Sequence, residues 1–184
     1  THDNTDYDRA RFEVPAHHWA DLSEGDYGVS LLNDCKYGYD VKGNTLRLSL
    51  LRSPVDPDPR ADEGLHIFTY ALYPHAGDWR NGTVQQGFEL NQPLVAIPVR
   101  SHKGPLPPVH AFAAVDADNV ILDTVKKAED GQEIVVRAYE AYGQRGQAEI
   151  TFAHRPAAVV ECDLMEEHDR PLRLRGNTVT FTIK

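Results

Sequence analysis

The stretch LLNDCKYGYD, residues 31–40, gathers side chains whose chemistry could serve catalysis or ligand binding. Cys35 beside Lys36 could form a thiolate, because a neighbouring cation lowers the pKa of a thiol. Adjacent strand residues point to opposite faces, however, and no histidine nearby in the sequence is placed as a base. We therefore favour a strand end that runs into a hairpin over thiol catalysis. A loop that presents polar and aromatic groups to a ligand is the alternative.

The stretch RSPVDPDPRADEG, residues 52–64, crowds four carboxylates together with two arginines. Spaced carboxylates suit Ca²⁺, which prefers several oxygen ligands. Pro57 and Pro59 stand where a calcium-binding loop must turn, so the pattern favours a surface loop stiffened by proline. An exposed loop with both Arg and Asp could also hydrogen-bond the hydroxyl groups of a sugar.

Other catalytic and metal-binding patterns do not occur in the sequence. The nine histidines form no His-Glu-x-x-His, no cysteine pair has zinc spacing, and no Gly-rich phosphate loop is present. Trp19 and Trp79 could stack on sugars, but anchoring of the core or of loops is the favoured role. The residues therefore predict a protein without a self-contained catalytic set.

Charge and composition exclude several classes of partner. The net charge of −9 argues against nucleic acid and against anionic membranes, since both favour clustered Lys and Arg. No apolar run approaches the ~20 residues of a membrane span. Cys35 and Cys162 could form one disulfide, but free thiols in a reducing compartment are favoured, which predicts a cytoplasmic location.

Strand patterns dominate the chain. TLRLSLL, residues 45–51, alternates apolar and polar residues, and LHIFTYALY (65–73) and LVAIPVR (94–100) are further strand candidates. Five more follow after residue 118, in NVILDTV, EIVVRAYEA, QAEITFA, AAVVECDL and TVTFTIK, with Gly- and Asn-rich turns between them. The best short-helix candidates are TVQQGFEL and HHWADL. This spacing predicts an all-β, antiparallel β-sandwich protein.

One proline-rich connector divides the chain. SHKGPLPPVHA, residues 101–111, holds three of the twelve prolines, and proline fixes the backbone in an extended form. We therefore place a domain boundary between residues 105 and 106.

Five long stretches, in order, resemble the C-terminal half of α-mannosidases of glycoside hydrolase family 38, most similar to the bacterial and fungal vacuolar-type branch. They are THDNTDYDRARFEVPAHHWADLSE, YGVSLLNDCKYGYDVKGNTLRLSLLRSP, FTYALYPHAGDW, LNQPL and VILDTVKKAEDGQEIVVRAYEAYGQRG. The resemblance implies that residues 1–105 are the C-terminal part of a supersandwich domain, beginning inside it at Thr1. It also implies that residues 106–184 are a small terminal β-sandwich, which stops short of the final strand usual in the family.

The resemblance implies a chemistry that lies outside this chain. The family cleaves α-mannosides with retention, using an Asp nucleophile and a Zn²⁺ ion in an N-terminal catalytic domain. No such motif occurs in the 184 residues. We therefore expect no catalytic or metal residue and no cofactor here, and an inactive isolated chain. A stand-alone carbohydrate-binding β-sandwich module and a purely structural domain are the alternative functions. The implied partners are the catalytic domain of the same protein, called the parent enzyme below, and its α-mannoside substrate. A homo-oligomeric parent enzyme is compatible with this.

The resemblance also suggests where the chain approaches substrate. In the family an Arg in an Asp-Asp-x-Arg-Gly stretch lies near the active-site cleft, and this chain has DPDPRADEG in that region. The pattern departs, because Arg60 is not followed by Gly. Four residues are therefore expected to line the rim of the parent enzyme's cleft: Asp34, Arg52, Asp58 and Arg60.

Overall fold

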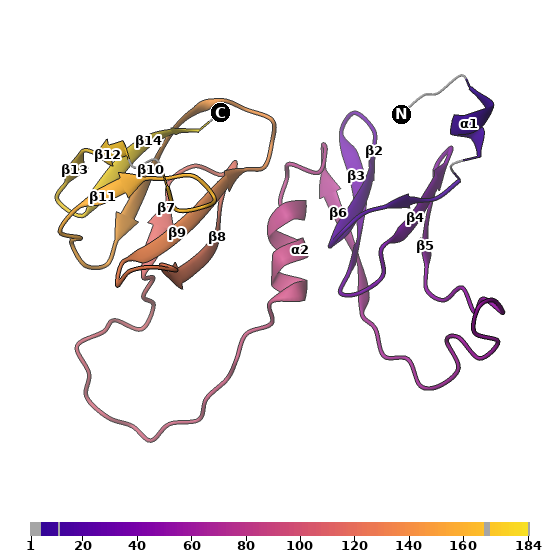
Figure 1. Cartoon of the computed structure of the whole chain (residues 1–184), viewed down its shortest axis with the longest axis horizontal. Coiled ribbons are helices and arrows are strands. Elements are labelled where there is room, and N and C mark those ends of the chain that lie inside the picture. Colours follow the sequence, from indigo (N-terminus) through magenta and orange to yellow (C-terminus); the bar gives the residue numbers. More distant parts are fainter. Residues whose placement is uncertain (1–4, 11, 168–169, 184) are drawn as a thin grey trace. The chain divides into compact units, whose positions relative to one another are not determined.

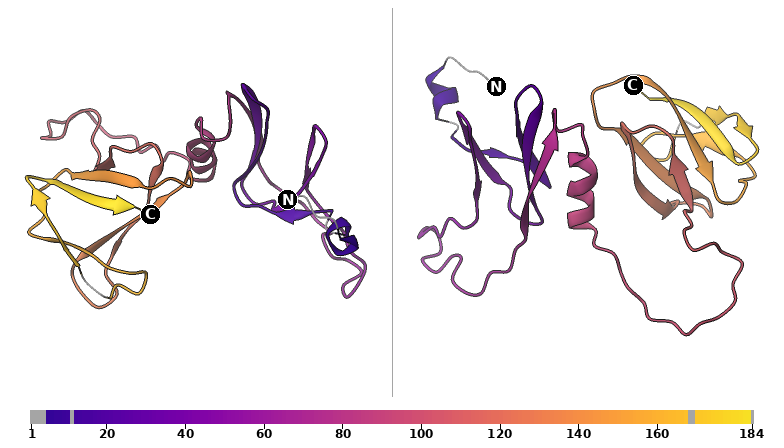
Figure 2. Two further views of the ribbon diagram at one scale, coloured as in Figure 1. Left: turned by 90° about the horizontal axis from the view of Figure 1, so that it is seen from above. Right: turned by 180° about the vertical axis from the view of Figure 1, so that it is seen from behind.

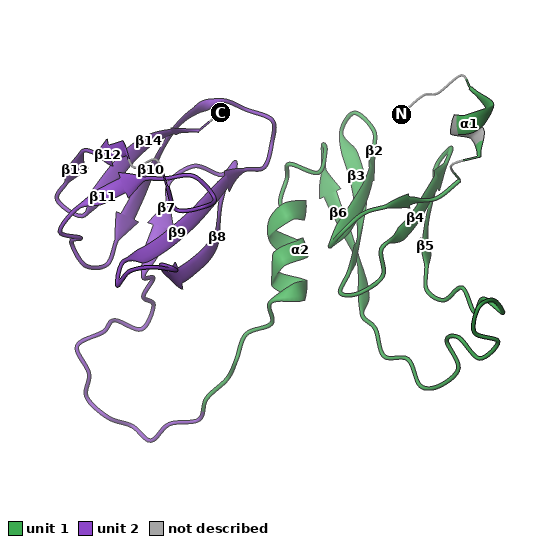
Figure 3. Ribbon diagram, in the orientation of Figure 1, with its two compact units in different colours: residues 1–97 green, residues 98–184 purple. Residues whose placement is uncertain are grey.

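The computed structural model describes residues 5–10, 12–167 and 170–183. The chain forms two compact units, Thr1–Ile97 and Pro98–Lys184 (Figure 3). Residues 92–112, which span the junction, lie outside helices and strands. The boundary expected between residues 105 and 106, and the assignment of the two parts to a supersandwich and a terminal sandwich, stay predictions.

Over its described residues, unit 1 contains two three-stranded antiparallel sheets and two helices (Figure 1). One sheet has the order β1-β4-β5 and the other β2-β3-β6. The elements are α1 (Asp6–Arg9), β1 (Val14–Pro15), β2 (Trp19–Ser23), β3 (Tyr27–Asn33), β4 (Gly38–Lys42), β5 (Thr45–Ser49), β6 (Tyr70–Ala76) and α2 (Thr83–Asn91).

The core of unit 1 is built around β3, the central strand of its sheet. Leu31 and Leu32 point to opposite faces of the sheet, and both are buried. α2 packs against this sheet with Val84 and Gly87 buried (Figure 2). An added Cβ at Gly87 would lie 2.8 Å from Cδ1 of Trp19, so glycine permits the close approach of helix and sheet.

Unit 2 is built only from strands and loops over its described residues. A four-stranded sheet has the order β13-β14-β10-β7, and two hairpins, β8-β9 and β11-β12, complete the unit. Its buried side chains include Val120, Ala148, Ile150 and Val179. The strands are β7 (Ala113–Val115), β8 (Val120–Lys127), β9 (Ile134–Glu140), β10 (Gly146–Phe152), β11 (Val159–Glu161), β12 (Arg170–Leu172), β13 (Leu174–Arg175) and β14 (Thr178–Ile183).

The antiparallel all-β class is confirmed, and so are most of the strands. The turn at residues 42–44 joins β4 to β5, with Gly43 at a positive φ of 60° that suits glycine. TVQQGFEL is α2, as predicted.

Three local predictions are wrong, in whole or in part. HHWADL is not a helix, because Trp19–Ser23 pairs with β3 along its whole length. The strand expected from residue 65 begins only at Tyr70, and residues 94–100 form no strand. Each difference depends on whether a partner strand lies beside the segment, which a local sequence pattern does not contain.

Candidate functional site

Asp34 follows β3 and ties the end of this strand to the segment that leads into β6. Its backbone N–H donates to the carbonyl oxygen of Thr69 at 3.1 Å, and the Thr69 N–H donates to Asp34 Oδ2 at 2.9 Å. Hydrogen bonds from the Cys35 thiol and from Thr69 lower the pKa of the Asp34 carboxyl. Asp34 therefore has a structural task at the edge of the sheet.

Cys35 does not have the environment of a nucleophilic thiol. Its hydrogen bond to Asp34 raises the pKa of the thiol, and Lys36 opposes this with a smaller effect. A reactive cysteine needs the opposite shift, because the thiolate is the nucleophile. Cys35 and Cys162 form no disulfide with each other, as predicted.

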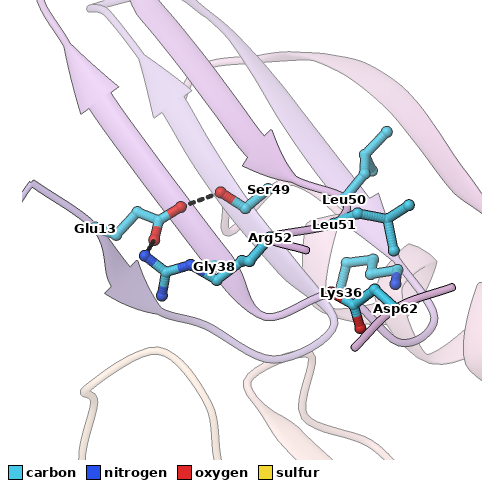
Figure 4. Close-up of a pocket in the computed structure, with 8 residues that line it drawn as sticks. All are labelled: Glu13, Lys36, Gly38, Ser49, Leu50, Leu51, Arg52 and Asp62. Atoms are coloured by element: carbon cyan, nitrogen blue, oxygen red, sulfur yellow. Dashed lines mark hydrogen bonds and ion pairs between the residues drawn. The ribbon is translucent and has the colours of Figure 1, made fainter. Parts of the chain in front are cut away.

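Arg52 lies at an open surface pocket with a volume of about 270 Å³ (Figure 4). Its guanidinium pairs with Glu13 Oε2 at 3.4 Å, and the other Glu13 oxygen accepts a hydrogen bond from the Ser49 hydroxyl. Lys36 and Asp62 lie at the other side of the pocket. The lining residues are Glu13, Lys36, Gly38, Ser49, Leu50, Leu51, Arg52 and Asp62.

The groups that line the pocket suit the binding of a neutral polar ligand better than they suit catalysis. It offers two cations and two carboxylates, of which Glu13 is already paired. Asp62 Oδ2 accepts the backbone N–H of Ser53 at 2.9 Å, and this hydrogen bond lowers the pKa of the Asp62 carboxyl. The lowered pKa favours the ionised form of Asp62, which does not suit a general acid, and Glu13 is engaged by Arg52 and Ser49.

Asp58 and Arg60 lie on the exposed loop between β5 and β6 and do not line the pocket. Asp58 Oδ1 accepts the backbone N–H of Arg60 at 2.9 Å, which shapes the turn. The structure thus brings Arg52 together with Asp62 and places Asp34 next to the sheet. It leaves Asp58 and Arg60 at the loop surface.

A buried polar network in unit 1 escaped the sequence analysis. Asp21, Ser30, His75 and Thr83 come from β2, β3, β6 and the start of α2. The Ser30 hydroxyl donates to Asp21 Oδ2 at 2.8 Å, and His75 Nε2 lies 2.7 Å from the same oxygen. Ser30 Oγ is also 2.7 Å from Thr83 Oγ1 and 3.2 Å from His75 Nε2.

The atoms of this network have one consistent set of donors. The hydrogen of Ser30 goes to Asp21, so the Thr83 O–H donates to Ser30 Oγ. The single hydrogen on His75 Nε2 goes to Asp21 Oδ2, which is nearer than Ser30 Oγ. Asp21 also accepts from the Ser23 hydroxyl, so its carboxylate receives three donors. The side chains of His75 and Asp21 are only 1% and 6% exposed.

The same atoms exclude a catalytic relay. In a Ser-His-Asp triad the acid and the nucleophile use opposite nitrogens of the imidazole ring. Here both contact Nε2, while His75 Nδ1 is buried without a partner among the described residues. The network joins three strands and a helix, and is structural. The sequence shows these polar residues only as members of separate segments. Their contact becomes visible once the pairing register of β2, β3 and β6 is known.

The indole rings of Trp19 and Trp79 are in contact with each other. They stack with centroids 5.5 Å apart, and the Arg80 guanidinium lies 4.5 Å from the Trp79 centroid. This arrangement supports the anchoring role over a sugar platform.

Two searches over the described part of the chain bear on metals and membranes. No group of three or more His, Cys, Asp or Glu residues there is placed to hold a metal ion. No helix there is long and apolar enough to cross a bilayer.

Comparison with known proteins gives two family matches. Residues 1–60 match the family described as "Glycosyl hydrolases family 38 C-terminal domain". Residues 119–184 match "Glycosyl hydrolases family 38 C-terminal beta sandwich domain".

Curated relatives match nearly the whole chain. Human "Alpha-mannosidase 2C1" is 45% identical over 99% of the chain, and "Alpha-mannosidase G" of Dictyostelium discoideum is 43% identical over 91%. The "Alpha-mannosidase" of Saccharomyces cerevisiae is 39% identical over 90%. The chain spans only 18% of the human relative and 16% of the other two.

The fold is also that of a solved structure. The crystal structure of an alpha-mannosidase from Enterococcus faecalis V583 matches 94% of the chain, with a TM-score of 0.73 at 23% identity. The chain covers 21% of that protein.

Proposed function

Because the chain belongs to the C-terminal region of glycoside hydrolase family 38, we propose that it is the non-catalytic β-sandwich portion of a retaining α-mannosidase. One observation carries the proposal: both ends match C-terminal domains of this family, and the chain spans less than a fifth of its curated relatives. The remainder of the parent enzyme, with its catalytic domain, is then the partner, and a terminal α-mannoside is the substrate.

The roles of the polar side chains support a non-catalytic part. The Asp21–His75 pair is buried within a structural network, and the Asp34 carboxylate is engaged by Thr69. Retaining glycosidases need two carboxyl groups about 5 Å apart that face the substrate, one of them able to act as a general acid. Of the two carboxylates in the pocket beside Arg52, Glu13 is paired with Arg52, and Asp62 has a lowered pKa that does not suit a general acid.

The described residues do not fit the zinc ion that the family implies. They contain no cluster of His, Cys, Asp or Glu placed to hold a metal. We therefore assign Zn²⁺ to the catalytic domain of the parent enzyme and derive no step through it here. Two cysteines that are not joined in a disulfide are compatible with a cytoplasmic location for the parent enzyme.

We further propose that Asp34, Arg52, Asp58 and Arg60 lie along the rim of the parent enzyme's cleft. Arg52 is the residue best placed for contact with a sugar, since it borders a pocket and its side chain is 71% exposed. A guanidinium donates several hydrogen bonds to hydroxyl oxygens without taking part in bond cleavage. Such a contact binds substrate and transition state alike.

Arg52→Ala in the parent enzyme is expected to raise the KM for an aryl α-mannoside about three- to tenfold, with kcat unchanged within about twofold. Steady-state kinetics measure both constants. Arg47→Ala is the matched control, because Arg47 is also exposed and paired with a carboxylate, Asp40, yet lies outside the pocket. Equal KM values for the two variants would remove Arg52 from the rim.

A further inference from the structure

The segment Leu94–Val99 (LVAIPV), called the exit segment below, follows α2 with an apolar sequence and no partner strand. Its four large side chains, Leu94, Val95, Ile97 and Val99, are each at least 72% exposed. Over the described residues, no backbone group hydrogen-bonds to the segment. Aliphatic, β-branched residues with unpaired backbone groups are typical of a strand that lacks its neighbour.

A second apolar surface lies at the same end of unit 1. β6 is an edge strand of its sheet, and Tyr70 and Leu72 alternate along it with exposed side chains. The chain enters β6 and leaves α2 at this end (Figure 1). Asn91 Nδ2 donates to the Asn33 carbonyl at 3.0 Å, and Asn33 pairs with Tyr70, so these contacts hold the end of α2, from which the exit segment departs, near the start of β6.

Most of the polypeptide of the related proteins lies outside the region that matches this chain, and it is available to cover these surfaces. The chain covers 18% of its human relative and 21% of the solved bacterial enzyme, so most of such a protein lies outside the 184 residues. The exit segment carries no charged residue in a chain whose net charge is −9. An uncharged, apolar segment fits an apolar sheet of the same polypeptide better than a charged partner.

We propose that the exit segment is a β-strand in the parent enzyme, where it pairs with a strand from outside residues 1–184 beside the exposed face of β6. The inference rests on the proposed function, because the partner is the remainder of the parent enzyme. Pairing would satisfy the free backbone groups and bury the four apolar side chains together with Tyr70 and Leu72.

Hydrogen–deuterium exchange of the exit-segment amides in the 184-residue chain and in the parent enzyme tests this proposal. The expected result is exchange at the rate of an unstructured peptide in the chain, and exchange about 100-fold slower or more in the parent enzyme. Ile97→Asp should abolish most of the protection in the parent enzyme. Leu164→Asp, at an exposed apolar position of unit 2, should leave it unchanged.

Three results would overturn the inference. The first is fast exchange of the exit-segment amides in the parent enzyme. The second is equal protection of these amides in the Ile97→Asp and wild-type parent enzymes. The third is slow exchange in the 184-residue chain alone. If that slow exchange depends on protein concentration, a second copy covers the segment. Hydrolysis of an aryl α-mannoside by the same parent sample separates the two hypotheses. Activity with fast exchange rejects only this inference, whereas protection without any activity rejects the proposed function.

Discussion

Replacing Asp21 with alanine is expected to lower the free energy of unfolding of the chain by about 3–5 kcal/mol, because it leaves two buried donors without an acceptor at about 1–3 kcal/mol each. The carboxylate accepts hydrogen bonds from Ser23, Ser30 and His75. Without the Asp21 carboxylate, the Ser30 hydroxyl and the His75 N–H remain buried without an acceptor. The hydrogen bonds that join β2 to β3 and β6 through these side chains are then lost. Urea unfolding followed by circular dichroism measures the change.

Asp78→Ala is the matched control for this prediction. Asp78 also pairs with a basic side chain, since Arg80 Nη1 lies 2.6 Å from its Oδ2, but both groups are at the surface. Water solvates such a pair in the folded and unfolded states, so its removal, with the exposed hydrogen bond that Asp78 accepts from the Arg80 backbone N–H, should cost at most about 1 kcal/mol. Equal losses in the two variants would show that the Asp21 network does not stabilise unit 1.

Tyr39→Ala is expected to destabilise the chain by a similar amount, about 3–5 kcal/mol, as for other buried aromatic side chains cut to alanine. Tyr39 is only 1% exposed, and burial raises the pKa of its phenol. Its hydroxyl accepts a hydrogen bond from Asn33 Nδ2 and donates to the Leu31 carbonyl at 3.3 Å. The side chain thus connects β4 of one sheet to β3 of the other.

Two variants separate the contributions of the Tyr39 ring and hydroxyl. Tyr39→Phe keeps the ring and should cost about 1–2 kcal/mol, because only the hydrogen bonds are lost. Tyr37→Ala removes an exposed tyrosine two residues away and should have no measurable effect in the same urea titration. A Tyr37→Ala loss as large as that of Tyr39→Ala would contradict the assignment of Tyr39 to the core.

The fold was predictable where a strand shows its own periodicity. Leu46 and Leu48 alternate with Thr45 and Arg47, and the Gly43 turn before them needs no tertiary information. Residues 17–22 carry no such pattern, so β2 became visible only through its pairing with β3. The exit segment is the reverse case, in which a strand-like sequence forms no strand within the residues described.

The candidate site was predictable only in part, for the same reason. Arg52 was singled out through the family resemblance, and the structure places it beside a pocket. Glu13, which pairs with it, lies 39 positions earlier and is brought close by the register of β1, β4 and β5. His75 is 54 positions from Asp21, so their contact also depends on strand register.

Turnover of an aryl α-mannoside by the purified 184-residue chain with Zn²⁺ tests the central claim, that this is a non-catalytic part of an α-mannosidase. The parent enzyme, at the same concentration and with the same substrate, is the positive control. The account predicts rapid release of the aryl group by the parent enzyme and none above the buffer rate by the chain. Robust turnover by the chain that is lost in Asp34→Ala or Arg52→Ala would contradict it.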